Sequence, residues 1–553
     1  MAVSKDPWRR VELWFLIAYA VVFQSYVVYR SVRISEEYSK GPKAGWLNGL
    51  RQGWIMNRLM DLSDSQWRTF RAGLPALTGV MAIFTILAGG LKAGLHLSGR
   101  AMAWFWLIVS LSYIAYLHGA CVVFILAIAI SNFAITKAFG GTRALPILIW
   151  TFNIGFLVAN RVYEGYRFSS FGEQLAHLDQ YRGVMRWQIS FNFVILRMLS
   201  FSLDYHWARI LRPSTVNWEK HAQQCDLCTL EASEDSKAGC YLARQERPVP
   251  LFQYDVVMYL AYVLYAPLYL AGPIVSFNAF ASQLEKPQRT YSGTQIALYG
   301  LRWLACFLLM EVLTQFCYFN TLAISGVWQM LSPTEIFLIG YGVLNFMWLK
   351  FLLIWRFFRF WTLVNGIEAP ENMTRCMNNC YDLEGFWKGW HSSYNRYLVR
   401  YLYIPLGGSK WRLINVWIIF TFVAIWHDLE WKLLSWAWVT CLLWVPELVV
   451  KSIVKSHRME GFRNSPLFRE CCALAGSFNT TGLMTANLVG FVVGPAGMHM
   501  LLSRMLSLQN IPLLFGIVFS MYIGTKIMFH IREWEVQQKE NEKLKVPRSK
   551  SVD

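Results

Sequence analysis

Charged side chains are scarce in this chain. Asp, Glu, Lys and Arg make up 16% of its 553 residues, whereas 55% of the residues are hydrophobic and 26 are tryptophan. Soluble domains usually carry about 25% charged residues. A soluble chain of this length folds into several domains, each with a charged surface. The sequence holds too little charge to cover such surfaces, so its composition excludes a soluble protein and indicates one embedded in lipid.

Signals of processing, of repetition and of disulfide bonding are also missing. The first apolar run, residues 13–29, ends without a small-residue cleavage site, which is typical of an uncleaved anchor and not of a signal peptide. We find neither a solenoid repeat nor the inverted repeat of many transporters. The 11 cysteines are an odd number, and several lie inside apolar runs, where thiols behave as small hydrophobic groups. The chain therefore has no evident disulfide framework.

Acidic residues are the scarcer of the two charged kinds, with 34 acidic against 52 basic residues. The basic residues are scattered through loops and the ends of apolar runs instead of forming one patch. Membrane topology and anionic lipid headgroups both favour this distribution. The scattered distribution of the positive charge therefore indicates a membrane-embedded protein and argues against nucleic acid as a partner.

Long apolar runs are what the sequence has in place of charge. A membrane span needs roughly 20 apolar residues, because only a helix satisfies its own backbone in hydrocarbon. Candidate runs cover residues 13–29, 73–92, 101–118, 119–138, 144–161, 188–204, 254–280, 295–323, 334–357, 412–427, 432–453, 482–503 and 509–530. Since adjacent runs can form one bent or re-entrant element, we predict an all-α integral membrane protein with about 10–12 transmembrane helices plus re-entrant or interfacial helices.

This pattern divides the chain into three regions. We expect residues 1–54 to form an N-terminal anchor helix and a basic loop, residues 55–530 a multi-helix domain, and residues 531–553 a basic, disordered tail. The most polar internal stretch, residues 205–250, holds His221, Cys225, Cys228 and Cys240. Zinc sites use four such ligands, but one Cys-x-x-Cys pair beside a histidine is weak evidence. We therefore interpret this stretch as a mobile loop and expect no metal.

Aromatic and ionisable residues are densest between residues 376 and 436. Interpreted as one helix, residues 386–404 place Trp387, Trp390, Tyr394, Tyr397 and Tyr401 in a single stripe, with Arg396 and Arg400 on the opposite face. Trp and Tyr favour the membrane–water boundary, so this helix is expected at or just below that boundary. It ends at Pro405-Leu-Gly-Gly408, where proline and glycine turn the chain.

Two histidines flank this turn. His427 ends an apolar run, where an ionisable residue is costly and is by default a functional hypothesis, although a histidine that only bonds a neighbouring helix is the common alternative. His391 lies before the turn, so both imidazoles can face one cavity. Acyl transfer needs a base that takes the proton from an attacking hydroxyl, and histidine suits this role. A second polar group can position the acceptor or stabilise charge on the thioester oxygen.

At these residues the sequence resembles the membrane-bound O-acyltransferases, abbreviated MBOAT. The matching features are Trp387-Lys388 followed by His391, the run from Arg400 to Gly408, and Trp426-His427 in an apolar helix. The ordered set, which extends over about residues 55–530, is most similar to the glycerol-uptake-protein branch and to the Hedgehog acyltransferases. The resemblance implies catalytic roles for His427 and His391, and substrate binding by Trp387, Asn395, Arg400 and Trp426.

The resemblance also implies a substrate and a location. It implies a many-helix bundle around a tunnel, acyl-CoA as the donor, and transfer to the hydroxyl of a lipid or lipid-anchored acceptor. For this branch the implied acceptor is a lyso-glycosylphosphatidylinositol (lyso-GPI) lipid, acylated during anchor remodelling in the endoplasmic reticulum membrane. Lys388, Arg396 and Arg400 would then attract the phosphates of acyl-CoA.

Three alternatives remain open at this stage. Hedgehog-type relatives acylate proteins instead of lipids. A glycerol or solute transporter would use intramembrane charges such as Asp255, Arg302, Glu311 and Lys350. The resemblance further implies that Cys376 could ligate haem, because a cysteine in the corresponding loop of some relatives does so. A plain loop cysteine is the favoured interpretation, so no cofactor is expected to be required.

Overall fold

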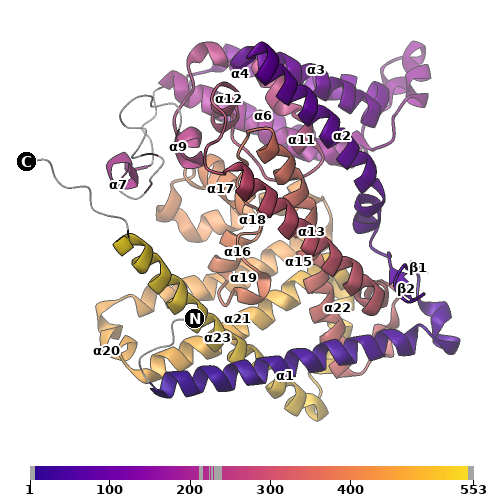
Figure 1. Ribbon diagram of the computed structural model, residues 1–553, viewed down its shortest axis with the longest axis vertical. Coiled ribbons are helices and arrows are strands. Elements are labelled where there is room, and N and C mark those ends of the chain that lie inside the picture. Colours follow the sequence, from indigo (N-terminus) through magenta and orange to yellow (C-terminus); the bar gives the residue numbers. More distant parts are fainter. Residues whose placement is uncertain (1–6, 211–215, 223–224, 226–227, 229–238, 546–553) are drawn as a thin grey trace, which may run out of the picture.

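The computed structural model describes residues 7–210, 216–222, 225, 228 and 239–545. Most of this part of the chain is helical and very little is strand, which confirms the predicted all-α fold (Figure 1). The sequence pattern did not predict one small antiparallel hairpin, in which β1 (Leu50–Gln52) pairs with β2 (Leu59–Asp61) and Leu50 lies opposite Asp61.

The helices that begin before residue 300 fall into a long group and a short group. The long helices are α1 (Pro7–Tyr38), α2 (Ser65–Leu95), α3 (Gly99–His118), α4 (Val122–Phe139), α5 (Leu145–Val162), α6 (Trp187–Ile210) and α13 (Gly293–Phe316). The short helices are α7 (Trp218–Ala222), α9 (Tyr241–Glu246), α10 (Val256–Val263), α11 (Ala266–Tyr269) and α12 (Phe277–Glu285).

The remaining helices surround the region in which the sequence placed the site. They are α14 (Phe319–Ile324), α15 (Pro333–Val364), α16 (Leu383–Gly389), α17 (Ser392–Leu398), α18 (Arg412–His427), α19 (Trp431–Val454), α20 (Glu460–Arg463), α21 (Pro466–Leu488), α22 (Gly494–Met505) and α23 (Ile511–Lys545). Two π-helical segments, Val399–Tyr403 and Val489–Val493, continue α17 and α21.

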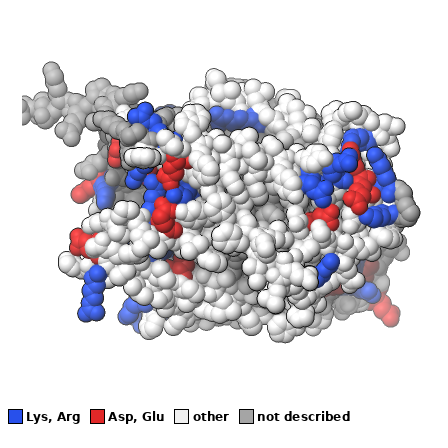
Figure 2. Space-filling view, turned by 90° about the horizontal axis from the view of Figure 1, so that it is seen from below, with Lys and Arg blue, Asp and Glu red and all other residues white. Residues whose placement is uncertain are grey.

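Ten helical segments of the described residues are long and apolar enough to cross a membrane, in agreement with the predicted number. Figure 2 shows the face of the molecule along which α1 runs. Charged side chains gather toward the two ends of this face, and the broad band between the two ends carries few charged side chains. The exposed apolar side chains of α1, such as Trp14 and Val22, would meet lipid in such a band. The molecule is therefore built as a multi-pass membrane protein.

Three predicted spans differ from the structure. The run 188–204 forms the mostly buried helix α6, which is not among the ten segments. Residues 254–280 are not one span but the three short helices α10, α11 and α12, because Pro267, Gly272 and Pro273 interrupt the run. Their side chains are mostly buried inside the protein, so the hydrophobicity of this run reflects the core and not contact with lipid. The run predicted at 482–503 is the end of a longer segment, Pro466–Met505, which begins with α21.

The C-terminal region also differs from the expectation of a disordered tail. Helix α23 continues to Lys545, and residues 546–553 lie outside the described part of the chain. Side chains of the extension bind the body of the protein: Arg375 pairs with Glu535 at 3.1 Å, and Arg532 donates to the carbonyl oxygen of Asn379 at 2.6 Å. Residues 531–545 are thus part of the folded protein.

Helix α6 supports the site from within the bundle. It packs against α4, α5, α10 and α12, and most of its side chains are buried. Its buried Arg197 donates hydrogen bonds to the carbonyl oxygens of Val263 and Leu268, at the C-terminal end of α10 and within α11. These bonds satisfy carbonyl groups that the broken helices leave without helical partners.

Candidate functional site

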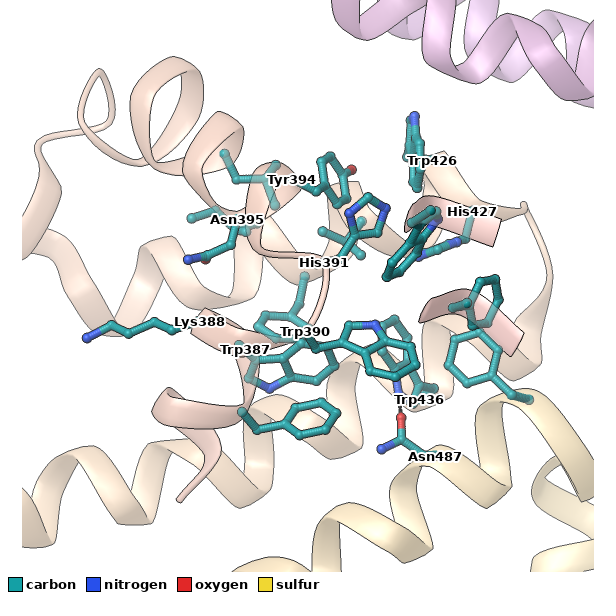
Figure 3. Close-up of a pocket in the computed structure, with 18 of the residues that line it drawn as sticks. Trp387, Lys388, Trp390, His391, Tyr394, Asn395, Trp426, His427, Trp436 and Asn487 are labelled. Atoms are coloured by element: carbon teal, nitrogen blue, oxygen red, sulfur yellow. Dashed lines mark hydrogen bonds between the residues drawn. The ribbon is translucent and has the colours of Figure 1, made fainter. Parts of the chain in front are cut away.

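A cavity of about 570 Å³ lies where α6, α15, α16, α17, α18 and α19 meet, and its volume is in the range typical of small-molecule sites. Both predicted catalytic histidines line it, together with three of the four predicted substrate-binding residues, Trp387, Asn395 and Trp426 (Figure 3). Trp390, Tyr394, Trp436 and Asn487 also line it. The structure thus brings residues from opposite sides of the Pro405–Gly408 turn to one space.

His391 occupies an unusual backbone position between α16 and α17. Its φ of 46° lies in the left-handed region, which costs a residue with a side chain roughly 1–3 kcal/mol. Asn372 stabilises the turn, because its carbonyl oxygen accepts from the Ser392 N–H at 3.0 Å and its side-chain oxygen accepts from the Ser393 N–H at 3.1 Å. The imidazole then stacks on Trp355, with ring centroids 4.3 Å apart.

This turn contradicts the prediction of one helix over residues 386–404. The chain leaves the helix at Trp390 and His391 and resumes it at Ser392, so the stripe is split. Tyr394, Tyr397 and Tyr401 still stack along the second part, at centroid distances of 6.3 and 4.7 Å. Trp390 and His391 themselves did not indicate the break, because contacts with the distant Asn372 stabilise it.

His427 is the last residue of α18. Its ring lies against Trp426, Trp436 and Phe491, with centroids 4.8, 6.2 and 6.1 Å away, and its exposed side faces the cavity. The carboxylate of the neighbouring Asp428 forms an ion pair with Arg161 and is therefore not paired with the imidazole of His427. The imidazole therefore meets the cavity without a carboxylate of its own helix beside it.

Asn192 of α6 fixes the end of α18 and was missed by the sequence analysis. Its side-chain amide donates to the carbonyl oxygen of Trp426 at 2.6 Å, and the indole N–H of Trp426 donates to the carbonyl oxygen of Asn192 at 2.9 Å. This reciprocal pair holds the residue immediately before His427. The amide of Asn192 inside the apolar run 188–204 was the available signal, because polar groups in such runs are costly unless they bind something.

Trp387 and its partners form the opposite wall. The indole of Trp387 packs on Phe420 and Trp436, with centroids 5.1 and 5.7 Å away. Trp436 in turn donates to the side-chain oxygen of Asn487 at 3.1 Å (Figure 3). A Cβ atom added at Gly490 would come within 2.7 Å of the Trp436 side chain, so only glycine permits this close approach. This wall is rigid and mostly aromatic.

Several polar atoms of the lining have no hydrogen-bond partner among the described residues. They are the Nδ1 of His391, the hydroxyl of Tyr394, and the indole N–H groups of Trp387 and Trp444. Buried polar groups are normally bonded, and each exception calls for an explanation such as water or a ligand. Four such groups around one cavity indicate a site that binds a polar part of a substrate.

Comparisons with known proteins agree with this geometry. The family model described as "MBOAT, membrane-bound O-acyltransferase family" matches residues 142–471, which include both histidines. Membrane-bound O-acyltransferase GUP1 of Saccharomyces cerevisiae is 34% identical over 537 residues, 96% of this chain and 92% of that protein. The chain belongs to the membrane-bound O-acyltransferase family. It is accordingly an acyltransferase.

Other relatives of this acyltransferase extend the comparison. Membrane-bound O-acyltransferase gup1 of Schizosaccharomyces pombe is 34% identical over 499 residues, 88% of this chain and 83% of that protein. Protein-cysteine N-palmitoyltransferase HHAT of Mus musculus is 27% identical over 245 residues, 42% of this chain and 48% of that protein. The resemblance inferred from the motifs is confirmed for both branches.

Arg400 is the predicted substrate-binding residue that the structure does not bring to the cavity of the acyltransferase. It is buried, pairs with Asp204 of α6 at 3.2 Å and forms a second ion pair with Glu246 at the end of α9. The π-helical segment Val399–Tyr403 changes the helical register here, so Arg400 does not share the exposed face of Arg396. Its position is that of a structural ion pair.

One edge of the acyltransferase cavity is charged. Lys388 and Arg412 line it, and they pair with Glu384 at 2.8 and 3.2 Å. Partial burial opposes ionisation of Glu384, but Lys388, Lys451 and Arg412 outweigh it and lower the pKa of this carboxyl group to about 2. Because the side chains of Lys388 and Arg412 are 66% and 42% exposed, both remain accessible to a soluble anion. We call this edge the basic mouth.

Cys376 does not fit a haem ligand in this structure. A thiolate that holds haem iron must face a cavity that admits the haem. Cys376 is absent from the lining of the acyltransferase cavity and from that of the smaller cavity among α1, α15, α21 and α23. No step of the reaction is therefore assigned to haem.

Proposed function

We propose that this acyltransferase moves a fatty acyl chain from acyl-CoA to the hydroxyl group of a lyso-GPI lipid, in the endoplasmic reticulum membrane. The observation that carries the proposal is the convergence of His391 and His427 on one aromatic cavity of the right size. A hydroxyl acceptor is supported by the names of the most similar relatives, which are called O-acyltransferases. The lipid acceptor and the compartment rest on the resemblance to the glycerol-uptake-protein branch.

His427 is the proposed general base. A nitrogen of its imidazole takes the proton of the acceptor hydroxyl as the oxygen attacks the thioester carbonyl carbon. The C–O bond forms, the C–S bond breaks, and the thiolate of CoA leaves and receives that proton. The acylated acceptor and CoA with a free thiol are the products, so no redox partner is needed.

His391 is the proposed orienting and charge-stabilising group. Burial among aromatic rings, together with the nearby His427, lowers the pKa of His391, so its imidazole is neutral near pH 7 and can donate one hydrogen bond. A donor held rigidly at the thioester oxygen stabilises the negative charge that develops there. The aromatic contacts and the constrained backbone at His391 supply this rigidity.

Two substrates require two approaches, and two cavities meet near the histidines. A second cavity of about 220 Å³ lies among α1, α15, α21 and α23, and it shares Leu344, Met377, Phe386 and Asn487 with the larger one. We assign the basic mouth to the phosphates of acyl-CoA and the second cavity to the acceptor. The apolar lining of the second cavity, which includes Phe23 and Ile527, suits a lipid chain.

Three of the four ionisable residues that a transporter would use are otherwise engaged. Glu311 pairs with Arg71 at 2.7 Å, Lys350 pairs with Asp64 at 2.8 Å, and Asp255 caps α10. Neither cavity includes Glu311, Lys350 or Asp255 in its lining. These charges connect helices, so they give no support to a solute pathway.

The test is acyl transfer by protein purified in detergent. We expect product only when acyl-CoA and a lysolipid acceptor are both present, and no product with a peptide that begins with cysteine. In cells that lack the gene, we expect anchor lipids to retain unremodelled chains while triacylglycerol is unchanged. Transfer to the peptide and not to the lysolipid would show that the acceptor is a protein. Unchanged anchor lipids in these cells would show that the acceptor is not a lyso-GPI lipid.

A further inference from the structure

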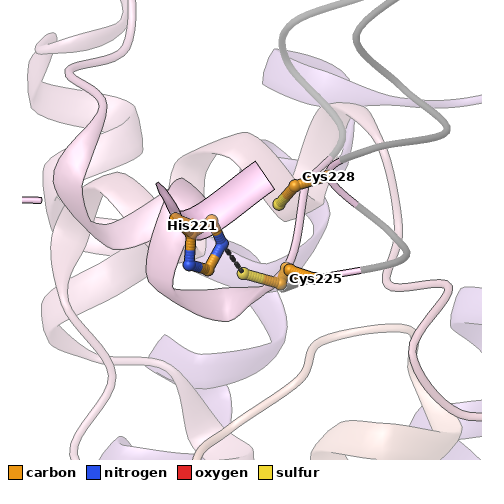
Figure 4. A group of neighbouring side chains, drawn as sticks. His221, Cys225 and Cys228 are labelled. Atoms are coloured by element: carbon orange, nitrogen blue, oxygen red, sulfur yellow. Dashed lines mark hydrogen bonds between the residues drawn. The ribbon is translucent and has the colours of Figure 1, made fainter. Parts of the chain in front are cut away.

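Three thiols and one imidazole lie together on the side of the molecule where α7 and α9 are found (Figure 1). Their potential ligand atoms all lie within 4.8 Å of one another. Figure 4 shows the side chains of His221, Cys225 and Cys228 turned toward a common point. We name this group the thiol cluster, and it consists of His221, Cys225, Cys228 and Cys240.

The sequence contained all four residues, but their spacing did not show that they come together. Cys225 and Cys228 form a close pair because the N–H of Cys228 donates to the carbonyl oxygen of Cys225 at 3.0 Å. His221 comes from the last turn of α7, and Cys240 directly precedes α9. The Sγ of Cys240 lies 3.3 Å from the Nε2 of His221, so the fold closes a set that the Cys-x-x-Cys pair only began.

We propose that the thiol cluster binds a structural zinc ion with three sulfur ligands and one nitrogen ligand. Zinc is held at about 2.3 Å by sulfur and about 2.0–2.1 Å by nitrogen, and a tetrahedral arrangement then places the ligand atoms roughly 3.5–3.8 Å apart. The four potential ligand atoms, which lie within 4.8 Å of one another, need to move only slightly closer together to reach this geometry. Four ligands of this kind fill the coordination sphere of zinc, so the site is structural and leaves no position for substrate.

The surroundings show why this segment needs a metal. Helices α7 and α9 have five and six residues, which is too short to be stable without tertiary support. The side chain of Cys240 does not cap α9, although Cys240 occupies the capping position. The ring of Trp218 packs edge-on against His221 at 5.4 Å and restrains the imidazole. Zinc binding would supply the folding free energy that these short elements lack.

The zinc-bound segment connects to the acyltransferase site through α9. Arg244 of α9 donates to the carbonyl oxygens of Gly239 at 2.9 Å and Lys286 at 2.8 Å, which ties the segment to the end of α12. Glu246, the last residue of α9, forms the ion pair with Arg400 described above. The metal would therefore stabilise the position of the π-helical segment that carries Arg400, without contacting either substrate.

The zinc content of the purified protein tests the proposed site independently of acyltransferase activity. Protein purified without chelator, and with any histidine tag removed, should contain one zinc ion per chain. Cys228→Ser should lose this zinc, whereas Cys471→Ser, at an exposed cysteine of α21, should retain it. Equal zinc in these two variants, or wild-type protein that neither contains zinc nor takes it up after chelation, would overturn the proposal.

Two measurements on the wild-type protein do not depend on a variant that folds. X-ray absorption at the zinc edge should give three sulfur neighbours at about 2.3 Å and one nitrogen. Cobalt exchanged into the site should show the visible absorption of a tetrahedral thiolate complex. A zinc environment of nitrogen and oxygen only, or a disulfide between two of these cysteines in protein isolated from cells, would show that the thiol cluster does not hold zinc.

Discussion

At the scale of single residues, the proposed base can be removed without disturbing the core. His427→Ala should leave the protein inserted and folded, because the imidazole faces the cavity and makes no hydrogen bond to the described part of the chain. Loss of a general base lowers turnover by about 10²–10⁴-fold, so we expect kcat to fall by that factor. Steady-state acyl transfer in detergent measures it. His457→Ala, at an exposed side chain outside the cavity, is the control and should keep full activity. Normal turnover in folded His427→Ala would remove the assignment.

His391 allows a graded test of its hydrogen-bonding role. His391→Asn keeps a side chain that donates and accepts, whereas His391→Leu keeps similar bulk and removes all hydrogen bonding. We expect the asparagine variant to retain at least ten times the kcat of the leucine variant, which corresponds to about 1.4 kcal/mol. Both variants face the same left-handed backbone, although asparagine adopts it more readily, so thermal stability must be measured beside activity. Equal kcat at equal stability would mean that His391 only packs.

At the scale of helices, the bond pair between α6 and α18 positions the proposed base. Asn192→Ala removes the hydrogen bond to the carbonyl oxygen of Trp426 and lets the end of α18 shift. Because a misplacement of about 1 Å can cost 10²-fold in rate, we expect kcat to fall by 10–100-fold with little change in the KM for acyl-CoA. Gln188→Ala, one turn earlier on α6, removes a bond to Glu164 that is remote from the site and should be neutral. Similar kinetics for both variants would contradict a positioning role.

The buried ion pair of Arg400 predicts an effect on stability. Arg400→Gln leaves the carboxylate of Asp204 without its partner, and breaking one side of a buried pair typically costs about 3–5 kcal/mol. We expect a large fall in Tm, and a smaller one when Asp204→Asn is added, because the double variant buries no Asp204 charge. The KM for acyl-CoA should not change. A raised KM at unchanged Tm would instead return Arg400 to the donor site, as the sequence had suggested.

The elements themselves show which parts of the structure a sequence can predict. Spans such as α13 and α15 were predicted because length and hydrophobicity are local properties of the chain. The turn at His391 was not, since its partner Asn372 is distant in sequence and neither proline nor glycine occupies the turn. Arg400 was placed on the wrong face for a related reason: a π-helical segment and two acidic partners from α6 and α9 decide its position.

At the scale of the whole molecule, the sequence predicted the class of fold and the two histidines but not the shape of the space between them. Patterns along one chain carry no information about how six helices enclose a volume, because that depends on packing. Tyr394 and Trp436 line the cavity, yet in the sequence they resemble any aromatic residue of a membrane helix. The positions of His391 and His427 on either side of one turn suggested that they act together, the family resemblance supported this, and the structure shows their common cavity.

Charge across the molecule predicts how the donor reaches this cavity. The phosphates of acyl-CoA cannot enter hydrocarbon, so they must stop at the basic mouth, where Lys388 and Arg412 share Glu384. Lys388→Gln should raise the KM for acyl-CoA several-fold, whereas Glu384→Gln frees both cations and should lower it. Added salt should diminish both effects, because these side chains are partly exposed. Arg396→Gln, exposed but outside the lining, should leave KM unchanged. If Glu384→Gln and Lys388→Gln shift this KM in the same direction, the mouth does not bind the phosphates, and the donor must approach from the second cavity.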